Sequence, residues 1–246
     1  MYLPLIFVLA VGLALGSFLG LVTYRLPKKQ SFVGGRSHCD RCRAEIKWYD
    51  NLPLLSFLLL GGRCRSCGKK ISLRYPLIEL ATAIGILGIY VLDLKSPIFL
   101  VLILLLSISI FVIDLEKKII PDELIFLGLG LTILALLVGW DDNLYLHFLG
   151  GFSSSFFLLL IHLVTRGKGM GLGDVKYALF AGTFLGFPGV ISWLFLSFLT
   201  GAGVGVILIL LGKAKLGRHI VFGPFLAFSF ILTYLFGEAL VKWLTG

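Results

Sequence analysis

The stretch VLILLLSISIFVID, residues 101–114, runs through apolar and small side chains and meets its first charge at Asp114. A helix needs about 20 predominantly apolar residues to cross a bilayer, and this run begins near residue 97. The whole chain has the same character, because 58% of its 246 residues are hydrophobic, 14% are charged and the mean hydropathy is +1.01. A soluble domain carries about 25% charged residues, so the sequence predicts an integral membrane protein.

Similar apolar runs lie on both sides of this stretch. Their lengths predict an all-α, polytopic membrane protein with about eight transmembrane helices. The predicted spans cover residues 2–24, 76–92, 97–114, 120–138, 144–165, 173–187, 189–211 and 221–241. The first run has no basic segment before it and exceeds the 7–15 apolar residues of a signal peptide core, so we expect it to be retained.

One long polar segment, residues 25–75, separates the first two predicted spans. Its twelve Lys and Arg residues outnumber three acids and give it a net charge of +9, which equals the charge of the whole chain. Cytoplasmic loops carry an excess of Lys and Arg, so we place this segment in the cytoplasm. Alternating spans then put 20 of the 22 basic residues on that side, and only Lys95 and Lys242 outside with both termini. Beside a membrane, such a surface indicates topology and contact with anionic lipid rather than binding to nucleic acid.

All four cysteines lie in this polar segment, as two C-x2-C pairs separated by 21 residues: Cys39 with Cys42, and Cys64 with Cys67. Four thiolates suit a closed tetrahedral Zn²⁺ site, and the metal would supply folding energy to a small domain with little core. A redox pair is the alternative, but nothing resembling a thioredoxin unit surrounds the cysteines, and a reducing cytoplasm disfavours structural disulfides. We therefore predict three parts: a first transmembrane helix over residues 1–24, a cytoplasmic zinc domain over 25–75 and a transmembrane domain over 76–246.

Four acidic residues lie inside or at the ends of predicted spans, where an ionisable group needs a partner or a function. Asp122 follows Pro121, and an acid in the first helical turn complements the positive end of the helix, so capping explains it. Asp114 ends its span, where the helix dipole disfavours an anion, and therefore requires another cause. Glu79 is expected to pair with a basic side chain from the cytoplasmic side and is a secondary site candidate.

The segment GMGLGDVK, residues 169–176, places the fourth acid, Asp174, behind Gly171 and Gly173. Capping explains an acid that opens a helix, but it does not require two glycines, which permit positive φ and the close approach of another chain. The predicted topology puts Asp114 and Asp174 at the cytoplasmic face. Two carboxylates that meet can share a proton, so that one acts as a base on water and the other as an acid. This is aspartic protease chemistry, although 60 positions separate the pair in the sequence.

Six stretches in this order resemble the type IV prepilin peptidases, which are membrane aspartyl proteases with a GxGD motif. The stretches are LGSFLGLVTYRLP (15–27), CDRC (39–42), YDNLPLLSFLLLGGRCRSCGKKISLRYPLIELATA (49–83), IDLEKKIIPDEL (113–124), GMGLGDVK (169–176) and FGPFLA (222–227). The resemblance implies that Asp114 and Asp174 are the catalytic pair. It also implies that the substrates are prepilins and pseudopilins, whose basic leader is cut at the cytoplasmic face of the bacterial inner membrane.

Many members of that family also methylate the new amino terminus with S-adenosylmethionine, an activity associated with the cysteine-bearing domain. The sequence shows no G-x-G-x-x-G loop after a strand, so methylation is implied by the resemblance alone. The expected substrate contacts are Gly171, Gly173, Glu79 and Lys176.

Two other classes of function remain as alternatives. A proton-coupled transporter would also contain membrane carboxylates, but relay acids tend to lie at mid-bilayer and transporters often have repeated halves, which this sequence lacks. A non-catalytic assembly factor with a zinc docking domain would leave Asp114 unexplained.

Overall fold

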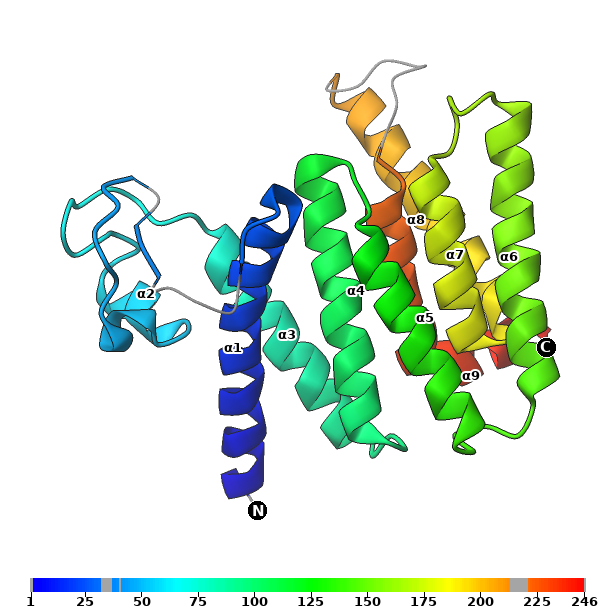
Figure 1. The fold of residues 1–246 in the computed structure, drawn as a ribbon, viewed down its shortest axis with the longest axis horizontal. Coiled ribbons are helices and arrows are strands. Elements are labelled where there is room, and N and C mark those ends of the chain that lie inside the picture. Colours follow the sequence, from blue (N-terminus) through cyan, green and yellow to red (C-terminus); the bar gives the residue numbers. More distant parts are fainter. Residues whose placement is uncertain (1, 32–36, 40, 213–220, 246) are drawn as a thin grey trace. The chain divides into compact units, whose positions relative to one another are not determined.

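A computed structural model describes residues 2–31, 37–39, 41–212 and 221–245 of the chain (Figure 1). These residues form helices and connecting turns, with two isolated β-bridges and no named strand among them. The helices are α1 (Tyr2–Arg25), α2 (Leu55–Leu59), α3 (Arg74–Val91), α4 (Pro97–Lys117), α5 (Asp122–Leu137), α6 (Leu144–Val164), α7 (Leu172–Leu185), α8 (Gly189–Leu210) and α9 (Gly223–Thr245), with short 3-10 helices η1 (Leu26–Lys28) and η2 (Trp48–Asn51). The chain divides into two compact units, Met1–Leu105 and Leu106–Gly246, so the boundary falls within α4.

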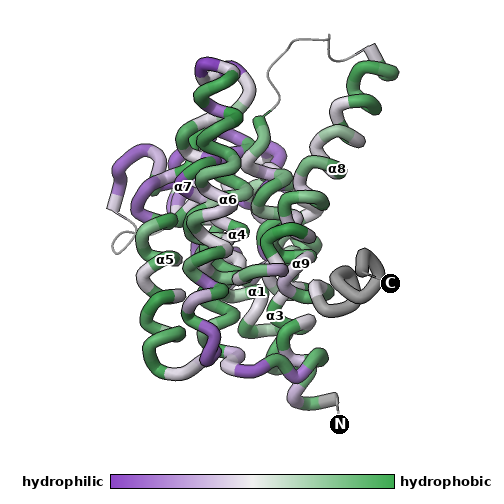
Figure 2. The backbone as a smooth tube through the Cα atoms, turned by 90° about the vertical axis from the view of Figure 1, so that its right-hand side faces the viewer, coloured by the Kyte–Doolittle hydropathy of each residue, from purple (hydrophilic) through white to green (hydrophobic). Residues whose placement is uncertain are grey.

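Every predicted span coincides with a helix whose ends differ from the prediction by at most four residues. Pro121 sets the start of α5 as its N-cap, and Gly186, with a φ of 66°, ends α7. Apolar residues dominate the helices and polar residues gather in the connections (Figure 2). Among the described residues, five helices are long and apolar enough to cross a membrane: α1, α3, α4, α6 and α8. The chain is therefore a multi-pass membrane protein, while the number of eight crossings stays a prediction because α5 and α7 have only 16 and 14 residues.

In the first unit, α1 lies along α3 (Figure 1). A stripe of glycines on α1 permits this contact, since a Cβ added to Gly16 would lie 2.6 Å from the Cα of Glu79. Arg74, at the start of α3, donates hydrogen bonds to the Gly20 carbonyl oxygen at 3.0 Å and to Thr23 Oγ1 at 2.7 Å. These contacts fix the end of the polar segment against α1.

In the second unit, the short helix α7 is the most enclosed element, with α5, α6, α8 and α9 packed against it. Gly150 of α6 faces Gly182 of α7 so closely that a Cβ on Gly150 would lie 2.7 Å from the Gly182 carbonyl oxygen. Ser154 Oγ also donates to the Ala178 carbonyl oxygen at 3.0 Å. The buried aromatic side chains around α7 are Tyr177, Phe180, Phe184, Trp193 and Phe230. This packing positions the first turn of α7, which carries Asp174.

Some residues used in the sequence analysis lie outside the described residues. They are Arg36, Lys213, Lys215 and Arg218, which the topology prediction counts as cytoplasmic, and Asp40 of the CDRC stretch.

Candidate active site and metal centre

Asp114 and Asp174 come from different helices and line the same cavity in the second unit. Asp114 lies in the last turn of α4, and Asp174 lies in the first turn of α7. Both side chains are buried, with 4% and 8% of the residue exposed. The cavity has a volume of about 310 Å³ and is also lined by Lys118, Ile119, Ile120, Asp122, Gly171, Gly173 and Lys176. The fold thus brings together two carboxylates whose meeting the sequence spacing could not establish.

Backbone and side-chain hydrogen bonds hold the GMGLGDVK segment. The Gly171 N–H donates to Asp174 Oδ2 at 3.0 Å, which closes the first turn of α7. His162 of α6 bonds through Nδ1 to the Met170 carbonyl oxygen at 2.7 Å, so its Nδ1 carries the hydrogen. The orientation of Asp174 is therefore fixed by its own loop and by α6.

Neither Gly171 nor Gly173 uses the positive φ that glycine permits. Gly171 is extended, with φ −79° and ψ 153°, and Gly173 lies inside α7, which begins one residue earlier than predicted. The lack of a side chain at Gly173 matters for packing, because a Cβ there would lie 3.3 Å from the Cβ of Ile120. This glycine therefore permits the close approach of Ile120 to α7, and its backbone conformation is ordinary for a helix.

Asp114 has an unusual environment. Its Oδ2 atom is buried and has no hydrogen-bond partner among the described residues. Gly223, the first residue of α9, lies directly beside the carboxylate, and a Cβ at this position would overlap Asp114 Oδ2. The amino-terminal end of α9 thus lies beside a carboxyl group whose own position, at the end of α4, disfavours a negative charge. Sequence reasoning assigned no role to Gly223, although the FGPFLA stretch that contains it was the available signal.

Asp122 and Lys176 form an ion pair at the edge of the cavity. Asp122 lies in the first turn of α5, as the capping argument predicts, and its Oδ2 lies 2.8 Å from Lys176 Nζ. The two side chains are 51% and 46% exposed, so the pair is accessible to water. Lys176, an expected substrate contact, bonds to Asp122 in this structure.

The four cysteine thiols converge in the first unit. Their Sγ atoms all lie within 4.8 Å of one another, and Cys39 Sγ lies 4.0 Å from Cys67 Sγ. A tetrahedral site with Zn–S bonds of about 2.3 Å requires sulfur atoms about 3.8 Å apart. The donor set and its spacing therefore fit a four-coordinate metal ion with only a slight contraction.

The two cysteine pairs fold into matching turns. In the first, the Cys39 N–H donates to the Ala44 carbonyl oxygen and the Arg43 N–H donates to the Cys39 carbonyl oxygen, both at 2.9 Å. The second pair repeats both bonds at the same length, with Cys64 bonded to Lys69 and Gly68.

The backbone also affects the thiols of these turns. Backbone N–H groups of Cys67 and Ser66 lower the pKa of the Cys64 thiol to about 7, whereas the pKa of the Cys42 thiol is raised to about 11 despite an opposing hydrogen bond with the Ala44 backbone.

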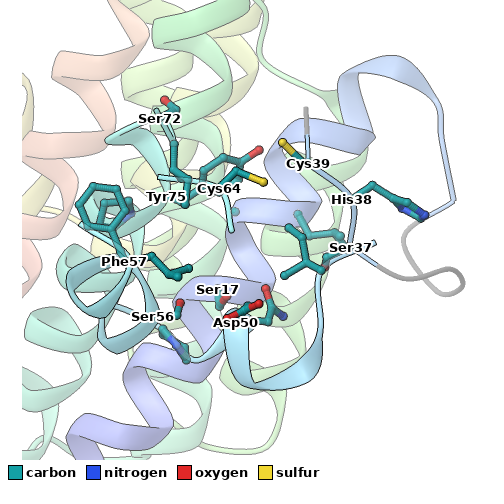
Figure 3. Close-up of a pocket in the computed structure, with 18 of the residues that line it drawn as sticks. Ser17, Ser37, His38, Cys39, Asp50, Ser56, Phe57, Cys64, Ser72 and Tyr75 are labelled. Carbon is teal, nitrogen blue, oxygen red and sulfur yellow. The ribbon is translucent and has the colours of Figure 1, made fainter. Parts of the chain in front are cut away.

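A larger cavity of about 1220 Å³ lies in the same unit, between α1, α3 and the polar segment (Figure 3). Glu79 lines it and is 7% exposed. The expectation that Glu79 pairs with a basic side chain is wrong for the described residues. Its Oε2 accepts a hydrogen bond from the Leu54 N–H at 2.8 Å, and the Ser17 side chain bonds to the same carboxylate.

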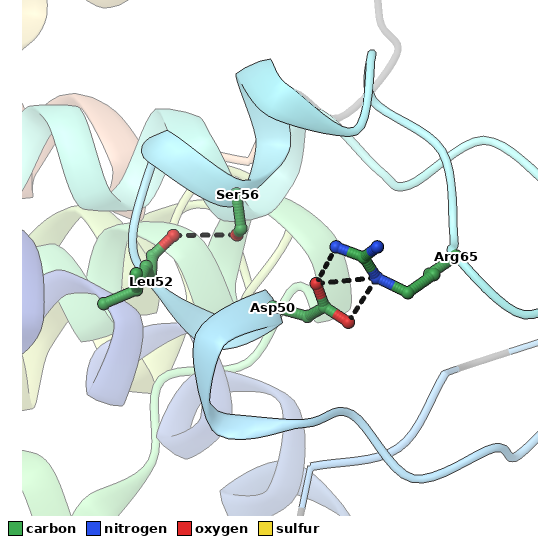
Figure 4. A network of polar contacts seen from close by, with 4 residues as sticks. All are labelled: Asp50, Leu52, Ser56 and Arg65. Atoms are coloured by element: carbon green, nitrogen blue, oxygen red, sulfur yellow. Dashed lines mark hydrogen bonds and ion pairs between the residues drawn. The ribbon is translucent and has the colours of Figure 1, made fainter.

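Asp50, another acid of this cavity, is already paired. Arg65 donates to both of its carboxylate oxygens, from Nη2 at 2.8 Å and from Nε at 2.9 Å (Figure 4). The Arg65 guanidinium thus links the second cysteine pair to η2.

Both parts of this chain are similar in sequence to known protein families. Residues 10–92 match the bacterial peptidase A24 N-terminal domain, and residues 99–206 match the type IV leader peptidase family. The Pseudomonas aeruginosa protein named prepilin leader peptidase/N-methyltransferase is 36% identical, over 97% of this chain and 93% of its own length. The chain belongs to the type IV leader peptidase family. Relatives of this family with the same name are 32% identical in Bacillus subtilis, over 94% of each chain, and 30% identical in Legionella pneumophila, over 99% of this chain and 96% of the relative. No solved structure matches the chain.

Proposed function

We propose that this family member is a membrane aspartic endopeptidase that removes the leader from type IV prepilins and pseudopilins, and that it then N-methylates the new amino terminus. Family membership and the name that its relatives share support both activities. The peptidase proposal depends on one observation above all: two buried aspartates, from α4 and α7, line one cavity.

The hydrogen bonds of the two aspartates favour different roles in cleavage. A hydrogen bond from an N–H group stabilises the charged form of a carboxyl group, so Asp174, whose Oδ2 accepts from the Gly171 N–H, is assigned as the carboxylate. The unpartnered Asp114 Oδ2 is suited to carry the shared proton. Asp174 then takes a proton from water as the water oxygen bonds to the scissile carbonyl carbon, while Asp114 gives its proton to the carbonyl oxygen. When the intermediate collapses, the carbon–nitrogen bond breaks, Asp174 gives the proton that it took from water to the leaving amine, and one hydroxyl proton of the intermediate returns to Asp114.

The substrate contacts are assigned to the edge of this cavity. Gly171 and Gly173 leave space for the extended chain around the scissile bond, and Lys176 contacts the peptide next to it. Glu79, the remaining expected substrate contact, belongs to the other unit and is not assigned to the cleavage step. A Gly173→Val variant with full cleavage activity would show that the substrate does not need the space beside this glycine.

The charge distribution supports a cytoplasmic location for the cysteine domain and for the catalytic pair, in a bacterial inner membrane that the chain crosses eight times. Anionic lipid would contact the basic residues of that face.

Two further components complete the proposal. Cys39, Cys42, Cys64 and Cys67 would hold a structural Zn²⁺ ion, since four thiolates leave no open position for a reacting water. S-adenosylmethionine would supply the methyl group.

The direct test uses purified full-length protein in detergent and a purified prepilin. Mass spectrometry of the products is expected to show a shortened pilin and, after addition of S-adenosylmethionine, a mass increase of one methyl group. An Asp114→Asn/Asp174→Asn double variant is the control and should leave the prepilin intact. A prepilin left intact by the wild-type protein, or cut equally well by the double variant, would count against the peptidase.

A further inference from the structure

The cavity of the first unit contains a carboxylate that peptide cleavage does not use. We propose that Glu79 binds the newly exposed amino terminus of the cleaved pilin and accepts its proton, so that the nitrogen can be methylated. This inference rests on the proposed methyltransferase activity and assigns a site for its acceptor.

The size and lining of the cavity suit two ligands. Its volume of about 1220 Å³ exceeds the roughly 300–1,000 Å³ of pockets for one drug-sized molecule, so a methyl donor and a peptide end fit together. Hydroxyl and aromatic side chains from α1, α3 and the polar segment offer both hydrogen bonds and apolar contact. They are Ser17, Phe18, Tyr24, Ser56, Phe57 and Tyr75.

Among the acidic side chains of this cavity, Glu79 is the one best suited to bind a cationic ligand. The charged or titratable side chains that line the cavity are Tyr24, Arg25, His38, Cys39, Arg41, Arg43, Glu45, Asp50, Cys64, Arg65, Lys69, Lys70, Tyr75 and Glu79. Of the three acids, Glu45 is exposed and Asp50 is paired with Arg65. Glu79 alone is buried, and among the described residues its partners are a backbone N–H and a hydroxyl rather than a cation. A buried carboxylate without a cationic partner favours a positively charged ligand, and a free amino terminus is one.

The protein holds this carboxylate in place before a ligand arrives. Leu54, whose N–H bonds to Glu79 Oε2, has a φ of 56° and a ψ of −46°, a conformation that a leucine rarely adopts. Such strain is retained where the surrounding structure requires it, often at functional sites. The backbone of Glu79 also meets Gly16 of α1 with no room for a side chain between them. A carboxylate has about four acceptor positions, so the two bonds from Leu54 and Ser17 leave capacity for an ammonium group.

With Glu79 as the proton acceptor, every proton and electron pair in the methyl transfer is accounted for. An ammonium nitrogen has no free electron pair, so it first gives one proton to the Glu79 carboxylate. The neutral nitrogen then forms a bond to the methyl carbon of the sulfonium donor, the carbon–sulfur bond breaks and its electron pair stays on sulfur as a neutral thioether. The product is a methylated amine that carries the positive charge.

The test separates methylation from cleavage by supplying a synthetic peptide with the mature pilin amino terminus. Purified full-length Glu79→Gln protein is expected to methylate it at least about 50-fold more slowly than wild type at pH 7, and to cleave prepilin within about twofold of wild type, because only the amine needs a proton acceptor. An α-amino group has a pKa of about 7.7–8.0, so at pH 9.5 the free amine prevails and the methylation defect is expected to shrink. Asp93→Asn, an exposed acid after α3 that does not line the cavity, is the matched control and should match wild type in both assays.

Different results of this experiment would contradict the methyltransferase proposal and the role of Glu79. Wild-type protein that leaves the mature peptide unmethylated contradicts the methyltransferase proposal. A Glu79→Gln variant that methylates at the wild-type rate, or whose defect is the same at pH 7 and pH 9.5, overturns the role of Glu79. If Glu79→Gln loses its bound zinc, Glu79→Asp replaces it. This variant keeps the charge one methylene further back, so its KM for the peptide amine should rise, and an unchanged KM would overturn the inference.

Discussion

The two units of the molecule each bury a carboxylate, but they treat its oxygens differently. Glu79 in the first unit receives hydrogen bonds from the Leu54 N–H and the Ser17 side chain. Asp114 in the second unit keeps one oxygen without a partner and shares its cavity with a second acid, Asp174. Fixed donors hold a carboxylate in one orientation for a ligand, whereas an unpartnered oxygen is available to exchange a proton. The function proposed above uses this difference by giving the two carboxylates separate roles in two successive reactions.

Replacement of either catalytic aspartate is expected to have the largest effect on activity. Asp174→Asn and Asp114→Asn are each expected to lower prepilin cleavage by about 10²–10⁴-fold, the usual contribution of general acid–base catalysis. Neither change should affect methylation of a peptide that already has the mature amino terminus. Rates of both reactions on the same purified variants provide the measurement. Loss of both activities in Asp174→Asn would show that the two sites are not separate.

Removal of the metal ion from the first unit should have the reverse effect and lower methylation more than cleavage. If the four cysteines hold a metal ion as proposed, a Cys39→Ser/Cys64→Ser variant is expected to bind less metal, to expose residues 25–75 to proteases and to lose methylation by more than about tenfold, because metal binding supplies folding energy to a small domain. Cleavage should fall less. Metal content by mass spectrometry and limited proteolysis follow the change. A variant that loses its metal ion but keeps its resistance to proteases would contradict a structural role for the metal.

A smaller effect is expected from a substitution at Gly223, which lies beside the Asp114 carboxyl group. A methyl group at Gly223 would occupy the space of the Asp114 carboxylate, so Gly223→Ala is expected to slow cleavage by about 10–100-fold through misplacement of a catalytic group. Gly203→Ala on α8 is the matched control, because a Cβ there has nothing within 4 Å. Equal cleavage rates for the two variants would show that Asp114 does not depend on this contact.

The ion pair between Asp122 and Lys176 should matter least. Exposed pairs of this kind contribute roughly 0–1 kcal/mol, so Asp122→Ala is expected to keep cleavage within about fivefold of wild type. A double-mutant cycle with Lys176→Ala measures the coupling of the two side chains in cleavage and in thermal unfolding. A loss as large as that of Asp114→Asn would move Asp122 into the catalytic site and end the present assignment.

The sequence predicted the helices well because bilayer crossing leaves a strong local signal. Apolar runs and their Pro and Gly boundaries locate α5 and α7 to within a few residues, without any knowledge of their neighbours. The residues of the site were harder to predict from the sequence. An acid at the unfavourable end of α4 marked Asp114, but only packing could reveal that Gly223, 109 positions later, lies beside it. The partner of Glu79 escaped prediction for a related reason, since a backbone N–H from Leu54 has no signature in the side-chain pattern.

The matching cysteine turns carry different residues directly after their second cysteine, and this difference bears on how readily each turn forms. Arg43 and Gly68 follow the second cysteine of each pair, with left-handed φ values of 57° and 66°. That conformation costs an L-residue roughly 1–2 kcal/mol, whereas glycine adopts it freely. The turn with Cys64 and Cys67 is therefore the better preformed half, and we expect it to capture the metal first, so that the earlier turn in the chain closes last over an ion already bound.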